Sequence, residues 1–137
     1  MRAWFRSVIA TAIAGALTIS CAGIIDPSKN LVESYGGTVA PGQISTAIHM
    51  VTVSKTGEYT VKITALSPVS SAVLGIDMAF ANNDGACTTQ LFQRNQFATL
   101  NQPALSGQIL SGKYCVVVYD IGALTVTATY TLTVSHP

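Results

Sequence analysis

The feature that most constrains the fold of this chain is a strict alternation of apolar and polar residues near its C-terminus. Between Val126 and Val134, every second residue is apolar, and the residues between them are all threonine. Successive side chains of a β-strand point to opposite faces, whereas a helix would scatter both sets around its circumference. The segment is therefore predicted to be a strand with one buried face and one wet face. Residues 58–65 repeat this arrangement, and their apolar side is formed by Tyr59, Val61, Ile63 and Ala65.

Further strands are expected between turn signals, at residues 35–40, 44–54, 73–81, 87–93 and 114–120. The turns between them contain glycine and asparagine, which supply the positive φ values that tight turns require. The segment 94–105 shows no alternation and includes Pro103, so it is predicted to be the longest loop, crossing from one sheet to the other. About seven to eight short strands without a helical period predict an all-β fold, an antiparallel β-sandwich or jelly-roll.

The first twenty residues have the pattern of a bacterial-type export signal. Arg2 and Arg6 form a basic region, and residues 7–20 are uncharged and mostly apolar. A membrane-spanning helix needs about 20 apolar residues, so this shorter run matches the core of a signal peptide instead. We expect a signal peptide over residues 1–20, a tether over 21–33 and a β-sandwich domain over 34–137.

Cys21 leaves two hypotheses open for the processing of the signal. Ser20-Cys21-Ala22 could be a site for ordinary signal peptidase. Leu17 to Cys21 also resembles a bacterial lipobox, in which a cysteine just after the apolar region is lipidated and becomes the first residue. Lipidation of Cys21 is the favoured hypothesis, and it would attach the protein to a membrane. The expected location is the cell envelope, as an outer-membrane or periplasm-facing lipoprotein, or the secreted fraction.

The other two cysteines are predicted to pair. Cys87 begins a predicted strand after an Asn-Asn-Asp-Gly turn, and Cys115 lies inside the predicted strand 114–120. An exported protein enters an oxidising compartment, where disulfides form and persist. We therefore predict a Cys87–Cys115 disulfide. The alternative is a pair of buried free thiols that pack as small apolar groups.

The charge of the chain argues against nucleic acid as a partner. From Cys21 onward the chain has five basic and six acidic side chains, a net charge of −1. This composition provides no basic stripe that could neutralise a row of phosphates.

No catalytic residues are predicted, and we expect neither an enzyme nor a cofactor. His49 lies inside a strand pattern, and His136, next to the last residue, is expected to fray. Neither histidine accompanies a Gly-x-Ser-x-Gly nucleophile elbow or another group of catalytic spacing. Tyr119 and Asp120 are candidates to line one end of the sandwich.

The best metal-ligand candidates are Asp77, Asn82, Asn83 and Asp84, because calcium prefers oxygen ligands from loops. They do not match an EF-hand loop, and an Asx turn explains the residues after position 81 more simply. No metal site is therefore predicted, and Asp77, Asn82 and Asp84 remain weak calcium candidates.

Four segments occur in the order of a known family pattern: Thr56–Val61, Gly75–Met78, Leu110–Val118 and Tyr130–Val134. Together they resemble the bacterial pre-peptidase C-terminal domain, a β-sandwich module of secreted proteases and other exported proteins. The resemblance covers residues 36–135 and implies a β-sandwich or jelly-roll domain. The chain departs from the family pattern because it has no catalytic domain beside it and has a cysteine pair that the family does not require. Some members of the family bind calcium or collagen. Only Asp77 falls on a family-like acidic position, so no calcium site is implied here.

The leading hypothesis is a non-catalytic exported module of the cell envelope or the secreted fraction, which makes protein or glycan contacts. Its uncharged, threonine- and serine-rich wet faces are compatible with carbohydrate contact, but an ordinary secreted surface has the same composition. One alternative is a lipid-anchored structural subunit of an envelope assembly. Another is a calcium-dependent adhesin-like domain.

Overall fold

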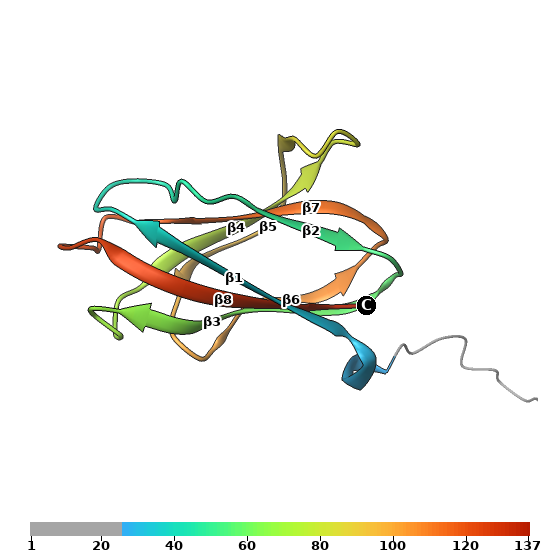
Figure 1. Ribbon diagram of the computed structural model, residues 1–137, viewed down its shortest axis with the longest axis horizontal. Coiled ribbons are helices and arrows are strands. Elements are labelled where there is room, and N and C mark those ends of the chain that lie inside the picture. The colour runs from blue at the N-terminus through green and yellow to red at the C-terminus, as the bar shows by residue number, and fades with distance from the viewer. Residues whose placement is uncertain (1–25) are drawn as a thin grey trace, which may run out of the picture.

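The computed structural model describes residues 26–137, which form two four-stranded antiparallel sheets packed face to face (Figure 1). The predicted all-β antiparallel sandwich is confirmed. A single 3₁₀ turn, η1, precedes the strands in this part of the chain. The elements are η1 (Pro27–Lys29), β1 (Leu31–Val39), β2 (His49–Val53), β3 (Gly57–Ser67), β4 (Leu74–Ala81), β5 (Cys87–Ala98), β6 (Pro103–Ile109), β7 (Gly112–Tyr119) and β8 (Ala128–His136).

The strand order places the two terminal strands side by side. One sheet, here sheet A, has the order β1-β8-β3-β6, and the other, sheet B, has the order β2-β7-β4-β5. None of the helical structure in residues 26–137 has the length and apolar character needed to cross a membrane. The predicted signal peptide and Cys21 lie outside the described residues.

The two strands with the clearest alternation, β3 and β8, lie in the middle of sheet A. In β8 the apolar parity is buried from Ala128 onward, while Val126 precedes the strand and is exposed. In β3 the inward parity is buried as predicted up to Ile63. Ala65 was expected on that face but is exposed, because a register shift after Ile63 turns the strand over and gives Leu66 the inward position.

The prediction of a long loop over residues 94–105 is wrong. β5 continues to Ala98 and β6 begins at Pro103, so only the short stretch 99–102 crosses between the sheets. Both are edge strands, and β5 has several register shifts against β4, which erase a period of two. Proline is tolerated at the first position of an edge strand because its missing N–H is not needed there.

The ordered domain begins earlier than predicted. β1 starts at Leu31, inside the segment 21–33 expected to be a tether, and pairs with β8 along its whole length. Asp26 caps η1 through its side chain, and the Asn30 side chain donates to the Glu58 carbonyl at 2.8 Å. In contrast, the predicted strand 44–54 is shorter, since β2 begins at His49.

The two long sides of the sandwich differ. On one side, β5 and β6 are joined by side-chain bonds from Gln93 to the Ser106 carbonyl and from Asn95 to the Ala104 carbonyl. Four aromatic rings pack behind them with centroids 5.2 to 5.9 Å apart, and these are Tyr59, Phe80, Phe92 and Tyr114. On the other side lie β1 and β2, which are linked through polar side chains, and this side holds the candidate site.

Candidate binding site between strands β1 and β2

Strands β1 and β2 are edge strands of different sheets along the same side of the sandwich (Figure 1). In the described chain, β1 pairs only with β8 and β2 only with β7. The Tyr35 hydroxyl of β1 lies 2.8 Å from the Met50 carbonyl oxygen of β2, so this carbonyl faces β1. In an antiparallel strand the peptide groups of alternate residues face the same edge. The backbone N–H and C=O of Thr52 therefore also face this edge, where no strand pairs with them.

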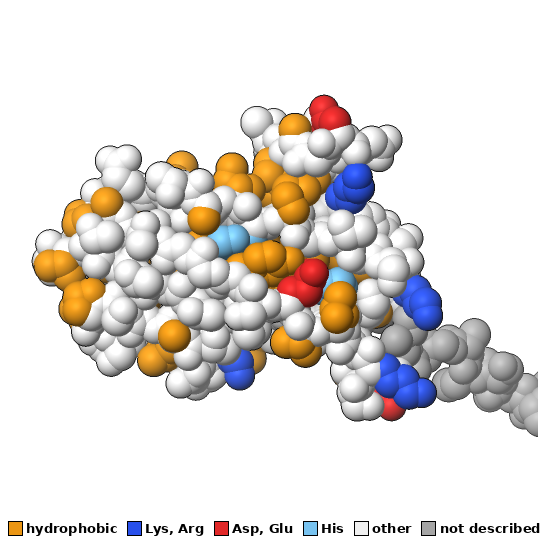
Figure 2. Space-filling view, in the orientation of Figure 1, with side chains coloured by type: hydrophobic (Ala, Val, Ile, Leu, Met, Phe, Trp, Pro, Cys, Tyr) orange, Lys and Arg blue, Asp and Glu red, His pale blue; other side chains and the backbone are white. Residues whose placement is uncertain are grey.

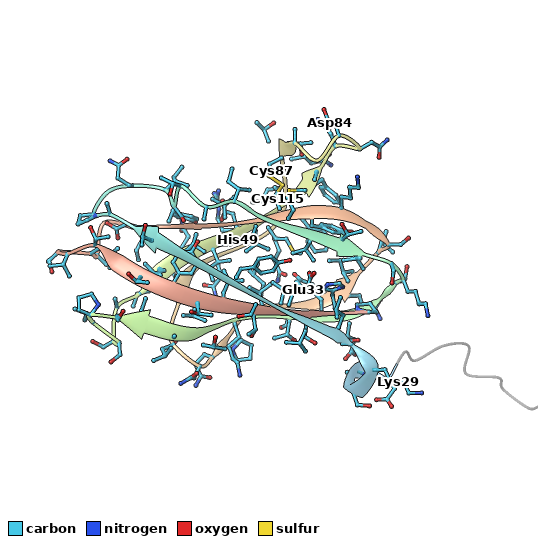
Figure 3. The ribbon with its side chains drawn as sticks, in the orientation of Figure 1. Lys29, Glu33, His49, Asp84, Cys87 and Cys115 are labelled. Carbon is cyan, nitrogen blue, oxygen red and sulfur yellow. A yellow bond between two sulfur atoms is a disulfide. The ribbon has the colours of Figure 1, made fainter. Side chains whose placement is uncertain are left out.

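Polar side chains fill the gap between these two edges. We call this set the polar seam, and it consists of Glu33, Tyr35, Ser45, His49, Tyr130 and His136. Figure 3 shows Glu33 and His49 along this side, and Figure 2 shows an acidic and two histidine side chains surrounded by apolar surface. A buried polar group is costly unless it is hydrogen-bonded, and the seam satisfies its members from both sheets.

One half of the seam is centred on Tyr130. Its hydroxyl lies 2.9 Å from Ser45 Oγ and 2.8 Å from His49 Nε2. Burial lowers the pKa of His49, because the charged imidazolium is disfavoured away from water. Burial also raises the pKa of Tyr130. This half of the seam is therefore neutral near pH 7.

The other half is centred on Glu33. Its Oε2 lies 2.7 Å from the Tyr35 hydroxyl and 3.0 Å from His136 Nε2. Burial and the neighbouring Glu33 carboxylate raise the pKa of Tyr35, since both disfavour a phenolate. The carboxylate thus links β1 to His136, the last residue of β8. Part of the Glu33 side chain remains exposed to solvent.

The expectation that His136 frays is wrong. Its side chain is 2% exposed, because β8 extends to this residue and pairs it with Leu31. The alternation of β8 contains this information, since His136 has the same parity as Tyr130 and Val134. The position of His136 next to the last residue was a weaker guide to its order than this alternation.

The seam is not arranged for nucleophilic catalysis. Ser45 and His49 each contact Tyr130, so the tyrosine stands between the hydroxyl and the imidazole. An activated serine needs a base within hydrogen-bond reach and access for a substrate. Ser45 is 4% exposed and also accepts the Ala47 N–H at 3.2 Å. The chemistry of the seam is that of a satisfied structural network.

A pocket of about 370 Å³ opens at one end of the seam, and we call it the end pocket. Its walls come from η1 and the start of β1, from β2 and the turn after it, and from the end of β8. The lining residues are Lys29, Leu31, Thr52, Ser54, Lys55, His136 and Pro137. Figure 3 shows Lys29 at this end of the molecule. The pocket therefore combines two ammonium groups, two hydroxyl groups and the free edge of β2 at Thr52.

Sequence reasoning missed the residues that line the end pocket, including His136, which was expected to fray. Lys29 and Leu31 were assigned to a tether, and Thr52 and Lys55 had no distinguishing motif. They come together because the ends of three strands meet, with β1, β2 and β8 contributing one segment each. No local pattern encodes that meeting.

The cysteine pair predicted from the sequence is bonded in the structure. Cys87 and Cys115 are joined by a disulfide with their Cα atoms 5.8 Å apart (Figure 3). Cys115 belongs to β7 and is fully buried, and the Met50 sulfur lies 3.3 Å from its Sγ. The bond ties the start of β5, and with it the β4–β5 hairpin, to β7.

The weak calcium candidates do not gather into one site. Asp77 lies in the middle of β4, where Arg94 Nε and Nη2 donate to its carboxylate at 2.8 and 2.5 Å. Asn82 follows the end of that strand, roughly 16 Å further along at the usual rise per residue. Asp84 accepts the Ala86 N–H in the turn at 3.2 Å, as an Asx turn does. Within residues 26–137, no cluster of three or more His, Cys, Asp or Glu side chains has the arrangement of a metal site.

The other two candidates, Tyr119 and Asp120, have different partners. Tyr119 donates to Asp77 Oδ1 at 3.1 Å on the outer face of sheet B. Asp120 accepts four backbone N–H groups, those of Gly42, Gly122, Ala123 and Leu124. Burial alone would raise the pKa of Asp120, but these donors outweigh it and the pKa is lowered. Asp120 organises two loops and is not directed at a ligand.

Comparison with known proteins does not assign this chain to a family. No family model and no curated protein matches it, so the pre-peptidase C-terminal resemblance is not supported by a family match. Among solved structures, a periplasmic inhibitor of g-type lysozyme from Aeromonas hydrophila is similar to 79% of this chain over 88% of its own length. The two share 18% identity at a TM-score of 0.49. Similarity at this level supports no conclusion about function.

Proposed function

We propose that this protein is a non-catalytic exported binding module that takes up an extended segment of a partner protein along the free edge of β2. The observation that carries the proposal is the coincidence of unpaired backbone groups at Thr52 with the end pocket. A segment added to this edge would extend sheet B by one strand, and the pocket would receive one of its side chains.

Strand addition is a general mode of peptide recognition that uses backbone hydrogen bonds for affinity and side-chain pockets for specificity. Natural proteins usually protect free edges with proline, inward charges or a covering loop. β2 contains no proline or charged residue, and its sequence is His-Met-Val-Thr-Val. The Tyr35 hydroxyl is bonded to the Met50 carbonyl, and the next peptide groups on the same edge are those of Thr52, a residue that lines the pocket.

The side chains of the pocket favour an acidic segment with an apolar neighbour. Lys29 and Lys55 stand at the walls, and Leu31 is 57% exposed beside them. Exposed ion pairs contribute only about 0–1 kcal/mol each. Their larger effect is on the choice of partner and on the rate of encounter.

The proposal is tested by changing the N–H of Thr52. Thr52→Pro removes a donor that faces away from β7, so the β2–β7 ladder is retained, whereas Thr52→Ala keeps the donor and removes only the hydroxyl. Linear peptides would be selected from a random library on the purified protein and titrated against the wild type and both variants. Thr52→Pro should weaken binding about tenfold or more, because an unpaired buried carbonyl costs about 1–3 kcal/mol. Thr52→Ala should bind nearly as the wild type does.

Thermal unfolding checks that Thr52→Pro is folded. If it is not, hydrogen exchange of the wild type provides the second measurement, and the bound peptide should slow exchange of the Thr52 amide. Equal binding by both variants, or an unchanged Thr52 amide, would refute the proposal, as would a failure to select any peptide.

Export and anchoring are part of the same proposal and rest on the sequence pattern of residues 1–21. The mass of the N-terminal peptide of the mature protein tests them. A diacylglycerol-modified Cys21 supports the lipid anchor, and Cys21→Ser should then release the protein from the membrane fraction. A mature chain that begins after residue 21 without lipid would contradict anchoring and leave the binding edge unaffected.

A further inference from the structure

The outer face of sheet B has a second pocket, built around Tyr119. This residue of β7 lies directly opposite Gly75 of β4. A Cβ atom added to Gly75 would collide with three carbons of the tyrosine ring, so the ring rests on the bare backbone of β4. The ring therefore forms part of the sheet surface rather than of the core. Gly75 is the residue that permits this position.

Polar groups surround the ring. The Tyr119 hydroxyl donates to Asp77, which also receives two hydrogen bonds from the Arg94 guanidinium. A guanidinium has five N–H donors, so three remain for other partners. The two-point contact holds its plane in one orientation. Gln96, two residues further along β5, adds an exposed amide, and the exposed side chain of Ile44 adds an apolar wall.

These five residues, Ile44, Asp77, Arg94, Gln96 and Tyr119, line a shallow pocket of about 200 Å³, which we call the Tyr119 pocket. The charges of Asp77 and Arg94 offset each other, so the pocket favours a neutral ligand. β4, the strand beneath the Tyr119 ring, is paired with both β5 and β7 and therefore has no free edge for peptide addition. Recognition at this place depends on side chains alone.

A neutral ligand with an apolar face and a polar rim fits this set. A pyranose ring has this character, because its C–H groups form apolar faces and its hydroxyls project from the edge. We propose that the Tyr119 pocket binds one neutral sugar unit of a glycan. The sugar packs a C–H face on the Tyr119 ring and directs hydroxyl groups to Arg94 and Gln96. This site is independent of the β2 edge, and the module would use both.

The test is an NMR titration of the isotope-labelled protein with three neutral oligosaccharides, namely chitotetraose, cellotetraose and maltotetraose. At least one should produce saturable shifts of the backbone amide signals of Gly75, Gln96 and Tyr119. Tyr119→Leu keeps an apolar side chain but removes the ring, and it should weaken binding about tenfold or more, equivalent to ~1.4 kcal/mol. Tyr119→Phe is the matched control, because it keeps the ring, and it should retain most of the affinity.

Arg94→Gln should also weaken binding, since it removes the donors that face the ligand. Thermal unfolding establishes that each variant is folded. The proposal is overturned if none of the three oligosaccharides shifts these signals at millimolar concentrations. It is also overturned if Tyr119→Leu binds as tightly as Tyr119→Phe, or if the shifts map to another face. Each of these results would leave the β2 edge proposal standing.

Discussion

Replacing both Cys87 and Cys115 by alanine should remove a large part of the stability of this domain. The disulfide joins residues separated by 28 positions. On the chain-entropy model, closing a loop of that length stabilises the folded state by about 3.6 kcal/mol at 25 °C. The total for a small domain is about 5–15 kcal/mol. At about 4 °C per kcal/mol for a domain of roughly 100 residues, the melting temperature should fall by about 15 °C.

The assay is urea denaturation of the oxidised wild type and of the double alanine variant, with the free energy of unfolding and the m-value fitted separately. The chain-entropy model attributes the stabilisation by a disulfide to its restriction of the unfolded chain. Removal of the cross-link should therefore let the unfolded state expand and raise the m-value. Met50→Ala is the control, since Met50 contacts Cys115 and its removal tests native packing alone. A loss below about 1 kcal/mol for the double variant would refute the reasoning. An unchanged m-value with an equal loss in Met50→Ala would do the same.

Three further outcomes are expected. Tyr130→Phe should lower the free energy of unfolding by about 1–3 kcal/mol, because Ser45 and His49 lose their shared buried partner, and urea denaturation measures this. Burial lowers the folded pKa of His49 below its usual 6.5, so the unfolded chain binds a proton first as the pH falls. Stability should therefore be greatest above pH 6.5 and decrease below it, and His49→Gln should flatten this dependence in melts across pH. Gly75→Ala should cost about 1–3 kcal/mol by displacing the Tyr119 ring, and a loss near zero would show that the ring moves freely.

The fold was predictable where a strand has neighbours on both sides. β3 and β8 each have one face against the core and one against solvent, so burial imposed a period of two on their sequences. The edge strands β5 and β6 lack this constraint. β5 is half-exposed on both faces and shifts register repeatedly, and β6 buries two successive residues, so neither shows a clean period.

The site was less predictable than the fold. Cysteine counting predicted the disulfide, because Cys21 was assigned to the end of the expected export signal and this left one pair, Cys87 and Cys115. The polar seam joins residues far apart in the chain, such as Glu33 and His136, and hydrogen bonds over that separation leave no local pattern. Thr52 is ordinary as a side chain, and its importance lies in the direction of its peptide group, which only the strand order determines.

The pairing of β1 with β8 also decides how the module responds to mechanical load. Leu31 lies opposite His136, so both residues mark the same end of one ladder. A pull between them would open the hydrogen bonds one pair at a time, like a zip, and would need little force. A pull that enters at Leu31 and leaves at Ala128, the far end of β8, would instead load all nine pairs of the ladder in shear. The same strands would then resist tension along one path and peel apart along the other.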